Sequence, residues 1–534
     1  MKEKIENLVK DALKSLNLKT EGFSVEHPTD LKMGDYSTNV AIKYGHKDEI
    51  VRYIVQNKLP EIEKVELAGP GFINFYLSKE FFINSLKEII EKREVFGKNE
   101  NLKGKKFFVE HTQPNIFKEF HIGHLMNNII GESVTRIVKA GSAEVKTASY
   151  HGDVGMHVAK AVWALLNNCV GNAYNCVGNA YAMGNKAYEE DKEAKSEIQE
   201  INKKIYERSD DKINDIYDSG RKESLKEFDS IYKRLNTNFD YSFFESESGD
   251  IGKELVLDFL KKGIFEESEG AVVFRGDKFG LHTRVFLNSD KLPTYEAKEI
   301  GLAKIKKETF PFDQSITITA NEQDAFFQVV EVVTGEVMSE LKGKLIHLSH
   351  GMLRLPTGKM SSRTGNVITA EKLIEDVKKK VKDNEQVAIG AIKYMILRQV
   401  IGNDIIFDIE KSVSTEGDSG VYLQYAYART NSLLEKAKML TPSVNENRQG
   451  NIRSIERLLY RFPEVVERAG KEYAPHYIIT YLTEIAGSFN NFYAHEQVIG
   501  DSPESAYRLV IVQAFNIVMK NGLTILGIPT PERL

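Results

Sequence analysis

Hydrophobic positions in the middle of the chain, from about residue 104 to 412, form short apolar runs separated by longer stretches with helical spacing. Alternation of short buried strands with helices is typical of a mostly parallel sheet, whose ligands bind at the carboxyl ends of the strands. We therefore predict an α/β domain with its chemistry at that edge. The strand-like runs are Phe107 to Glu110, Val145 to Tyr150, Val272 to Phe274, Ser315 to Thr319 and Leu345 to Leu348.

The pattern differs on either side of this block. Residues 1–98 combine a helical stretch with alternating positions from Val65 to Leu77, which predicts a small α/β accessory domain, followed by a charged linker from Glu91 to Lys106. A charged, helix-rich insertion at about 163–262 has the composition of a solvated helical face, and we assign it no chemistry. Residues 413–534 have wholly helical spacing, which predicts a helical bundle over Val421 to Ala437, Ile452 to Ala469, Tyr473 to Ala494 and Ala506 to Leu526.

Composition narrows the class of protein. With 534 residues and 41% hydrophobic positions, the chain can bury a large core. The net charge of −5 provides no global basic field, so any contact with RNA depends on local patches. No charged-then-apolar leader and no apolar run long enough to cross a bilayer is present, and we expect a cytosolic protein.

The two cysteines, Cys169 and Cys176, lie in a heptapeptide, NCVGNAY, that occurs twice in succession. In a helix, the second copy would add about 10 Å and turn the face by only about 20°. The sulfurs would then be too far apart for a disulfide, and two thiols alone do not make a zinc site. We interpret the repeat as a neutral duplication.

One candidate for phosphate chemistry is the turn after the first central strand, within EHTQPNIFKEFHIGHLMNNIIG from Glu110 to Gly131. If a helix begins at His121, then His121 and His124 project from one face, with no side chain at Gly123 between them. The helix N-terminus offers unpaired N–H groups to a phosphate. For such a pattern alone, two surface histidines beside a turn are the favoured interpretation.

A second candidate lies more than two hundred residues downstream, at LPTGKMSSRTGN from Leu355 to Asn366. Glycines and small hydroxyl residues flank Lys359, a composition suited to a mobile loop that brings an ammonium to phosphate oxygens. Together, HIGH followed by KMSSR resembles the signature pair of class I aminoacyl-tRNA synthetases, and the ordered pair is far more specific than either motif alone.

Further matches resemble arginyl-tRNA synthetases in particular, over essentially the whole chain apart from parts of the charged insertion. They are GDYSTN and AGPGFINFYL near the N-terminus, the long HIGH region, LHTRVFLNSDKLPTYEAKEIGLA, KMSSRTGNVI, GDSGVYLQYAYARTNSLLEKA and the ending NGLTILGIPTPERL. The resemblance implies a class I Rossmann-like catalytic domain, an N-terminal domain that contacts the tRNA elbow and a helical anticodon-binding domain.

The resemblance also implies an arginine pocket. Glu110 and Asn115 would hold the amino-acid end, while Tyr295 and Glu299 would hold the side chain, where the family commonly has Asp in place of Glu299. A planar guanidinium needs such acceptors. A solvated helical glutamate is the alternative interpretation of Glu299.

Two other matches to the family are incomplete. Gln323, in NEQDAFFQ, corresponds to a further acceptor, although the His usual after it is missing. In the segment YHGDVG, Asp153 is either functional or a turn former, and Val154 stands where Trp is usual.

The implied reaction has two steps: ATP-dependent formation of arginyl-adenylate, then transfer to the terminal adenosine of tRNA(Arg). ATP, brought with Mg²⁺, is a substrate, and we expect neither a tightly bound cofactor nor a resident metal. His121, Gly123, His124, Lys359, Met360 and Ser361 would bind ATP. Of these, His121, His124 and Lys359 would act on the developing charge, and no protein nucleophile is required.

For tRNA, the resemblance suggests that Tyr425, Arg429, Asn490, Tyr493 and Arg533 contact unpaired bases. Aromatic residues at helical spacing are more often core, which we take as the default for Tyr425 and Tyr427. A class I relative that charges another amino acid and a non-catalytic tRNA-binding relative are the alternatives. Glu110 with Glu299 favours a cationic substrate, and the intact HIGH and KMSSR favour catalysis. We expect a monomer.

Overall fold

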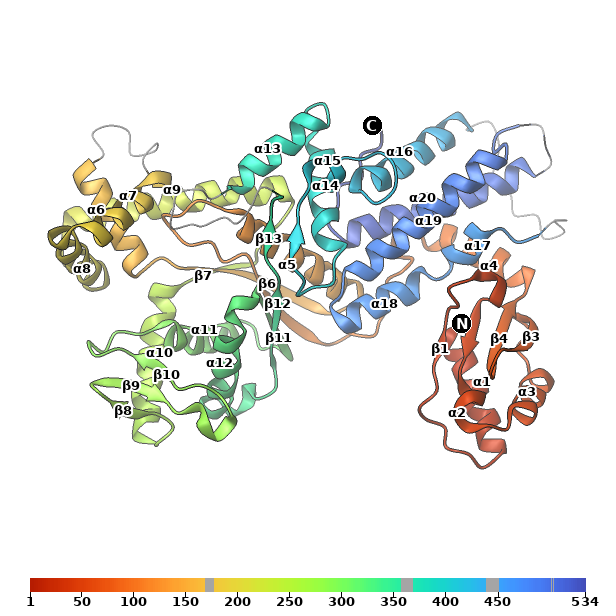
Figure 1. Cartoon of the computed structure of the whole chain (residues 1–534), viewed down its shortest axis with the longest axis horizontal. Coiled ribbons are helices and arrows are strands. Elements are labelled where there is room, and N and C mark those ends of the chain that lie inside the picture. Colours follow the sequence, from red (N-terminus) through yellow and green to blue (C-terminus); the bar gives the residue numbers. More distant parts are fainter. Residues whose placement is uncertain (169–176, 357–367, 438–450, 501, 503) are drawn as a thin grey trace.

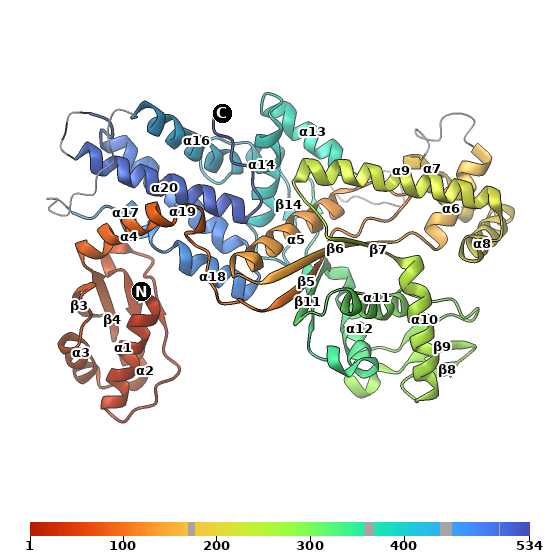
Figure 2. The ribbon, with the colours of Figure 1, turned by 180° about the vertical axis from the view of Figure 1, so that it is seen from behind.

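The computed structural model describes residues 1–168, 177–356, 368–437, 451–500, 502 and 504–534. The predictions for Cys169, Cys176, Lys359, Met360 and Ser361 therefore concern residues outside the described ranges. Figure 1 shows an elongated molecule, with the central sheet between helices of the insertion on one side and the C-terminal helices on the other. The N-terminal domain, in red, lies beneath the C-terminal helices, as the view from behind also shows (Figure 2).

The N-terminal domain is a four-stranded antiparallel sheet, with strand order β1-β2-β4-β3, packed against helices. The positions from Val65 to Leu77 form the β3–β4 hairpin, as their alternation suggested. The elements are α1 (Lys2–Ser15), β1 (Val25–Glu26), η1 (Leu31–Met33), β2 (Tyr36–Thr38), α2 (Val40–Tyr44), α3 (Lys47–Gln56), β3 (Ile62–Ala68), β4 (Phe72–Leu77), α4 (Lys79–Lys92) and η2 (Arg93–Val95).

The N-terminal domain docks on the C-terminal helices through buried polar contacts. Arg457 Nε donates to Asp35 Oδ1 at 2.7 Å, and Tyr36 Oη donates to Glu464 Oε1 at 2.5 Å. The ring of Tyr460 packs within the hydrophobic core of the N-terminal domain. The polar contacts and the shared hydrophobic core together hold the N-terminal domain against the C-terminal helices.

The central sheet confirms the α/β prediction. It has five parallel strands in the order β12-β11-β5-β6-β7, and Glu110, at the end of β5, pairs with Thr317 on one side and Ala148 on the other. The elements before the insertion are β5 (Lys106–Glu110), α5 (Ile122–Ala140) and β6 (Glu144–His151). Those after it are α11 (Tyr295–Thr309), β11 (Gln314–Ala320), η5 (Asn321–Gln323), α12 (Asp324–Val337), η6 (Ser339–Leu341), β12 (Leu345–His350) and β13 (Leu353–Arg354).

Two expectations about the central block need correction. The run Val272 to Phe274 lies in a separate antiparallel sheet with the strand order β10-β9-β8. A short loop joins β8 to β9, so no crossover helix is needed, and the pairing of β9 with β10 contains a bulge. The insertion also supplies β7, because the aromatic run Tyr241 to Phe244 pairs with β6. The elements of the insertion and of the small antiparallel sheet that follows it are α6 (Met156–Asn168), α7 (Val177–Glu190), α8 (Lys192–Glu207), α9 (Asp211–Leu235), β7 (Tyr241–Phe244), α10 (Glu245–Lys261), β8 (Glu266–Ser268), β9 (Ala271–Phe274), η4 (Gly276–Phe279) and β10 (Arg284–Leu287).

The C-terminal part is helical, as predicted, with one difference. The expected helix from Ile452 to Ala469 is two helices, because Pro463 has no N–H to continue a helix and is suited to a first turn. The elements from residue 370 onward are α13 (Ala370–Lys380), α14 (Glu385–Leu397), β14 (Ile405–Ile406), α15 (Ile409–Ser412), α16 (Gly420–Lys436), α17 (Ser454–Leu459), α18 (Phe462–Glu472), α19 (His476–His495) and α20 (Ser505–Ile525). None of the described helices has both the length and the apolar character needed to cross a bilayer.

Candidate active site

The two histidines of the HIGH turn lie where β5 leads into α5. His121 is the N-cap of α5, and its Nδ1 accepts from the backbone N–H of Gly123 at 3.1 Å and of His124 at 3.4 Å. His124 Nδ1 accepts in return from the His121 N–H at 3.3 Å, so the pair forms a capping box. The rings stack with centroids 3.7 Å apart. A Cβ on Gly123 would lie 2.9 Å from His121 Cε1, so this geometry requires glycine.

Both histidines are neutral donors. Burial lowers the pKa of His121 to about 4, and burial together with the neighbouring His121 and Lys118 lowers the pKa of His124 well below its usual value. Since Nδ1 of each ring accepts a hydrogen bond, the single proton of each neutral imidazole is on Nε2. The turn thus presents two Nε2–H donors beside a helix N-terminus, an arrangement suited to phosphate oxygens.

The loop between β5 and this turn is held in an uncommon backbone conformation. Thr112, Gln113 and Phe117 have positive φ angles of 80°, 47° and 64°. The Phe117 N–H donates to Ser224 Oγ of α9 at 3.1 Å, and the Thr112 N–H donates to Asn127 Oδ1 of α5 at 3.1 Å. Such strain persists only where neighbours determine the backbone, as these two helices do.

Residues 368–370, the first described residues after the KMSSR motif, lie beside the histidines. The Ile122 N–H donates to the Ile368 carbonyl at 3.2 Å, and the Ala370 N–H donates to the Phe120 carbonyl at 2.8 Å. His121 and Thr369 form an antiparallel bridge between these bonds. The first described residues after the KMSSR motif are therefore fixed against the HIGH turn.

A second group of polar residues lies along one face of α11. Tyr295, Glu299, Ala303 and Lys306 are four, four and three residues apart, which places them on one side of the helix. Tyr295 is 60% exposed, whereas Lys306 is buried. Glu299, Ala303 and Lys306 line a small cavity with Thr317 of β11, Phe327 and Glu331 of α12, and His347 of β12. The face thus combines a hydroxyl, a carboxylate and an ammonium at the sheet's carboxyl edge.

Two carboxylates, Glu110 at the end of β5 and Glu299 on α11, differ in their partners. Glu110 is fully buried, and its two oxygens accept from Lys306 Nζ at 2.9 Å and from Gln113 Nε2 at 2.5 Å. Glu299 makes no ion pair among the described residues. Burial, together with the negative charge of the neighbouring Glu110, raises the pKa of Glu299 well above its usual value. A carboxyl in this condition becomes ionised when a cation binds to it.

Another buried ion pair, which no motif marks in the sequence, lies next to Asn115. Glu245, at the start of α10, accepts from Lys298 Nζ at 2.6 Å, and both side chains are buried. Asn115 and Glu245 meet over Gly152, where a Cβ would lie 2.3 Å from Asn115 Oδ1 and 3.1 Å from Glu245 Oε1. The loop, β6, α10 and α11 therefore converge on Asn115.

Asp153, for which a functional and a structural role were both open, is a buried hydrogen-bond centre. It accepts from Tyr217 Oη at 3.1 Å, from Arg221 Nε at 3.3 Å, and from the N–H and hydroxyl of Ser246 at 2.9 and 2.8 Å. Val154 is buried in the core. These contacts join α9 to α10, and they leave Asp153 positioned for structure rather than for substrate.

Gln323 lies apart from this set. It is the last residue of η5, after β11, and its side chain is exposed. No contact of Gln323 with Glu299 is present among the described residues, so its assignment to arginine stays a prediction. Nearby, His347 stacks on Phe327 with centroids 4.2 Å apart, which places an imidazole from β12 at the cavity wall.

The proposed base-contacting residues lie on α16 and α19. The Arg429 guanidinium lies 4.1 Å from the ring centroid of Tyr493, and Asn490 Nδ2 donates to Tyr422 Oη at 2.7 Å. Tyr427 is buried, which agrees with the prediction that it packs in the core. Tyr425 is 46% exposed, so the same prediction is wrong for Tyr425. Arg533 is exposed and pairs with Glu435 at 3.0 Å.

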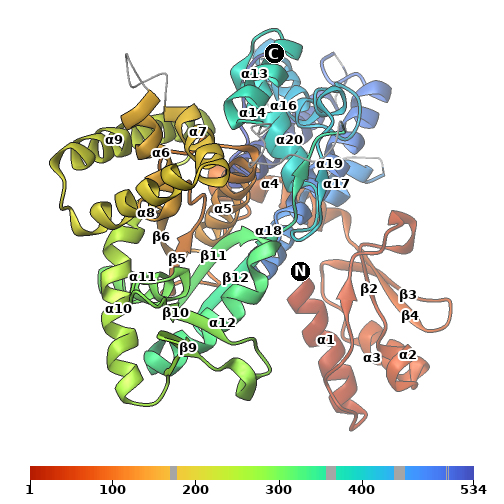
Figure 3. The ribbon, with the colours of Figure 1, turned by 60° about the vertical axis from the view of Figure 1, so that its left-hand side comes forward.

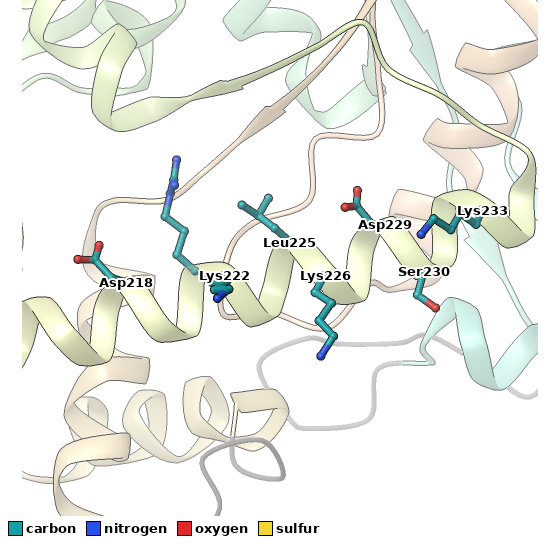
Figure 4. A pocket seen from close by; sticks show the side chains of 8 residues that line it. Asp218, Lys222, Leu225, Lys226, Asp229, Ser230 and Lys233 are labelled. Carbon is teal, nitrogen blue, oxygen red and sulfur yellow. The ribbon is translucent and has the colours of Figure 1, made fainter.

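The charged insertion borders the site more closely than its composition suggested. Gly220 of α9 packs on Phe117, Phe228 on Phe120, and Ser224 holds the loop, so one face of α9 covers the HIGH turn. A groove of about 600 Å³ runs along its other side (Figure 4). Its described lining residues are Asp218, Arg221, Lys222, Leu225, Lys226, Asp229, Ser230 and Lys233, four cations against two carboxylates.

The parallel sheet, the HIGH turn and the helical C-terminal part together define a class I aminoacyl-tRNA synthetase. The family model for the class I (R) tRNA synthetase catalytic domain matches residues 85–409, the arginyl-tRNA synthetase N-terminal domain matches 3–77, and the DALR anticodon-binding domain matches 423–534. The chain belongs to the arginyl-tRNA synthetase family.

Individual relatives agree with this assignment. An arginine-tRNA ligase of Streptococcus mutans is 32% identical over 88% of this chain and 88% of its own length. One of Halothermothrix orenii is 29% identical over 100% of this chain and 99% of its own. The solved arginyl-tRNA synthetase of Thermus thermophilus, at 22% identity, shares the fold with a TM-score of 0.79 over 100% of both chains. The predicted three-part fold class is confirmed.

Proposed function

We propose that this protein activates L-arginine with ATP and transfers it to the terminal adenosine of tRNA(Arg), as an arginine-tRNA ligase in the cytosol. The observation that carries the proposal is the half-buried carboxyl of Glu299, which has no ion-pair partner among the described residues and lies on the α11 face that also presents the Tyr295 hydroxyl. A guanidinium offers five donors in a plane and satisfies both acceptors. Since all groups named here come from one chain, the proposed working unit is a monomer.

The amino-acid end of arginine is assigned to Asn115 and Glu110. Glu110 is the last residue of β5, and Asn115 lies in the loop that follows, with its side chain against Gly152. Glu110 uses two hydrogen bonds inside the protein, and a carboxylate accepts about four. Its remaining capacity suits an α-ammonium group, while Asn115 suits either the ammonium or the carboxylate.

In the activation step, the arginine carboxylate attacks the α-phosphorus of ATP and pyrophosphate leaves. The Nε2–H groups of His121 and His124 are assigned to phosphate oxygens, where donors that are already positioned stabilise developing charge. Lys359, with Met360 and Ser361, is assigned to the pyrophosphate end. Mg²⁺ would come with ATP as part of the substrate, bridging phosphate oxygens; the described residues hold no cluster of three or more His, Cys, Asp or Glu that suits a metal.

In the transfer step, the tRNA 3′ end must reach the adenylate beside the HIGH turn. The α9 groove is assigned to its phosphates, because Lys222, Lys226 and Lys233 line it and α9 packs on that turn. At the other end, exposed Tyr425 and the stacked Arg429 and Tyr493 are assigned to unpaired bases of the anticodon loop.

The proposal is tested by arginine-dependent exchange of pyrophosphate into ATP, with and without tRNA that carries an arginine anticodon. Exchange that depends on arginine, together with charging of tRNA(Arg), is the expected result. Exchange with another amino acid would support a relative of different specificity. No exchange from folded protein, in the presence of tRNA, would overturn the activity and favour a tRNA-binding role.

A further inference from the structure

Three carboxylates and two ammonium groups converge around α11. Glu110 accepts from Lys306 at 2.9 Å, Glu245 accepts from Lys298 at 2.6 Å, and Glu299 has no cationic partner among the described residues. All four paired side chains are buried. The two lysines come from α11 itself, one residue before and seven residues after Glu299. With every group ionised, the set carries one excess negative charge.

This balance matters because the site recognises its substrate by charge. A buried carboxylate without a partner is costly, and two carboxylates close together without cations share a proton. Glu110 already disfavours ionisation of Glu299, and Lys306 opposes that effect. Lys306 lines the same cavity as Glu299, and its ammonium donates a hydrogen bond to Glu110. Its charge therefore acts on both carboxylates at once.

We propose that Lys306 is a positioning residue for arginine: it holds and neutralises Glu110, so that Glu299 is the single carboxylate left to ionise beside the arginine side chain and that end of the pocket accepts one cation. The inference rests on the proposed function, because it assigns the charge that selects the arginine side chain. A substrate with a neutral side chain would leave Glu299 protonated, and a second cation at the side-chain end of the pocket, away from the α-ammonium site at Glu110, would have no carboxylate to pair with.

Other titratable groups that face Glu299 come from each packed element. They are Glu110 from β5, Tyr150 from β6, Glu245 from α10, Glu296 and Lys306 from α11, Glu331 from α12 and His347 from β12. Of these, the Lys306–Glu110 pair can be neutralised as a unit without touching Glu299. That property makes a charge test possible.

The experiment measures arginine affinity as a function of pH for the full-length enzyme and for Lys306→Met, Lys306→Gln and Lys306→Arg. Removing the ammonium leaves Glu110 uncompensated, so the midpoint at which Glu299 ionises should rise by about one pH unit or more. Arginine binding below that midpoint should weaken at least about tenfold. Lys306→Arg should keep the original midpoint. Lys304→Met is the matched control, since Lys304 lies on the same helix and has no ion pair among the described residues.

The double variant Lys306→Met with Glu110→Gln separates charge from packing. If charge is the cause, neutralising both partners returns the midpoint toward that of the original enzyme, although affinity is lower. If the Lys306–Glu110 pair only supports the fold, the single and double variants lose stability without moving the midpoint, and the inference is overturned. Lys306→Gln, which can still donate to Glu110, serves if the Met variant does not fold. Absence of arginine binding by the unmodified enzyme would instead refute the proposed function.

Discussion

Replacement of His121 by Asn separates the capping role of this residue from its proposed role in catalysis. His121 Nδ1 caps α5 by accepting from two backbone N–H groups, while its Nε2–H is directed to substrate in our proposal. Asparagine is among the best N-cap residues and can accept the same bonds through Oδ1. It has no donor at the reach of Nε2. Alanine, in contrast, removes both functions.

The two effects differ in size. Loss of an N-cap costs about 0.5–2 kcal/mol of stability. Loss of one donor to a developing oxyanion costs roughly 10²- to 10³-fold in rate. We therefore expect His121→Asn to unfold at nearly the original temperature and to activate arginine about 10²-fold more slowly or worse. His121→Ala should be similarly slow and also less stable by about 1 kcal/mol.

The assay is pyrophosphate exchange with saturating arginine, ATP and tRNA, with thermal unfolding measured on the same samples. His124→Asn provides a parallel case, because His124 Nδ1 accepts only from the His121 N–H. A His121→Asn enzyme with near-normal exchange would refute the donor role. Rates that follow stability across the three variants would show that the histidines act only through the fold of the turn.

Three further predictions concern charge. The pKa of Glu299 is raised, so arginine binding should release up to one proton and strengthen by up to about tenfold per pH unit below that pKa; calorimetry in buffers of different ionisation enthalpy should show this release, and Glu299→Gln should abolish it. Arg457→Met leaves buried Asp35 without its cation, which costs about 3–5 kcal/mol; faster hydrogen exchange in η1 and β2 should result, whereas removal of the exposed Arg468 charge should cost less than about 1 kcal/mol and leave exchange there unchanged. Burial lowers the pKa of Lys393 to about 7, below that of an unfolded lysine, so this residue should add stability as pH rises from about 7 to 10, on the order of 1 kcal/mol per unit; equal pH slopes of unfolding for the original protein and Lys393→Met would contradict this.

Much of the fold could be predicted from the local pattern of hydrophobic positions. Most predicted runs show a single period, that of a strand or of a helix, and adjoin a run of the other type. The strands Phe107 to Glu110 and Ser315 to Thr319 are short, apolar and flanked by helical spacing, and they lie side by side in the sheet. The run Val272 to Phe274 has the same composition but a different partner. Strand pairing is a long-range property, and a three-residue apolar run does not reveal it.

The site was predictable only where a motif marks it. His121, His124 and Tyr295 were found through spacing and resemblance, but Lys306 and Lys298 are ordinary lysines in a helix with many charged residues. Their significance depends on Glu110 and Glu245, which lie 196 and 53 positions away in the sequence. A signal existed in principle, since a lysine seven residues after Glu299 must share its helical face. Burial of that face was not evident from the charged sequence.

Helix α9 connects the active site to the anticodon-binding part. Near its middle, Ser224 and Gly220 hold the strained backbone at Phe117. At its C-terminal end, Lys393 donates to the carbonyls of Leu235 and of Gly527 at 2.7 Å each.

Arg136 forms a second bridge at the same place. It donates to the carbonyls of Asn236 at 3.2 Å and of Thr524 at 3.3 Å. Two basic side chains thus join the C-terminal ends of α9 and α20, where helix carbonyls lack partners of their own. Figure 3 shows the C-terminal helices beside the catalytic part of the molecule. A continuous series of contacts therefore runs from the end of α20 through α9 to the loop that carries Asn115 and leads into the HIGH turn.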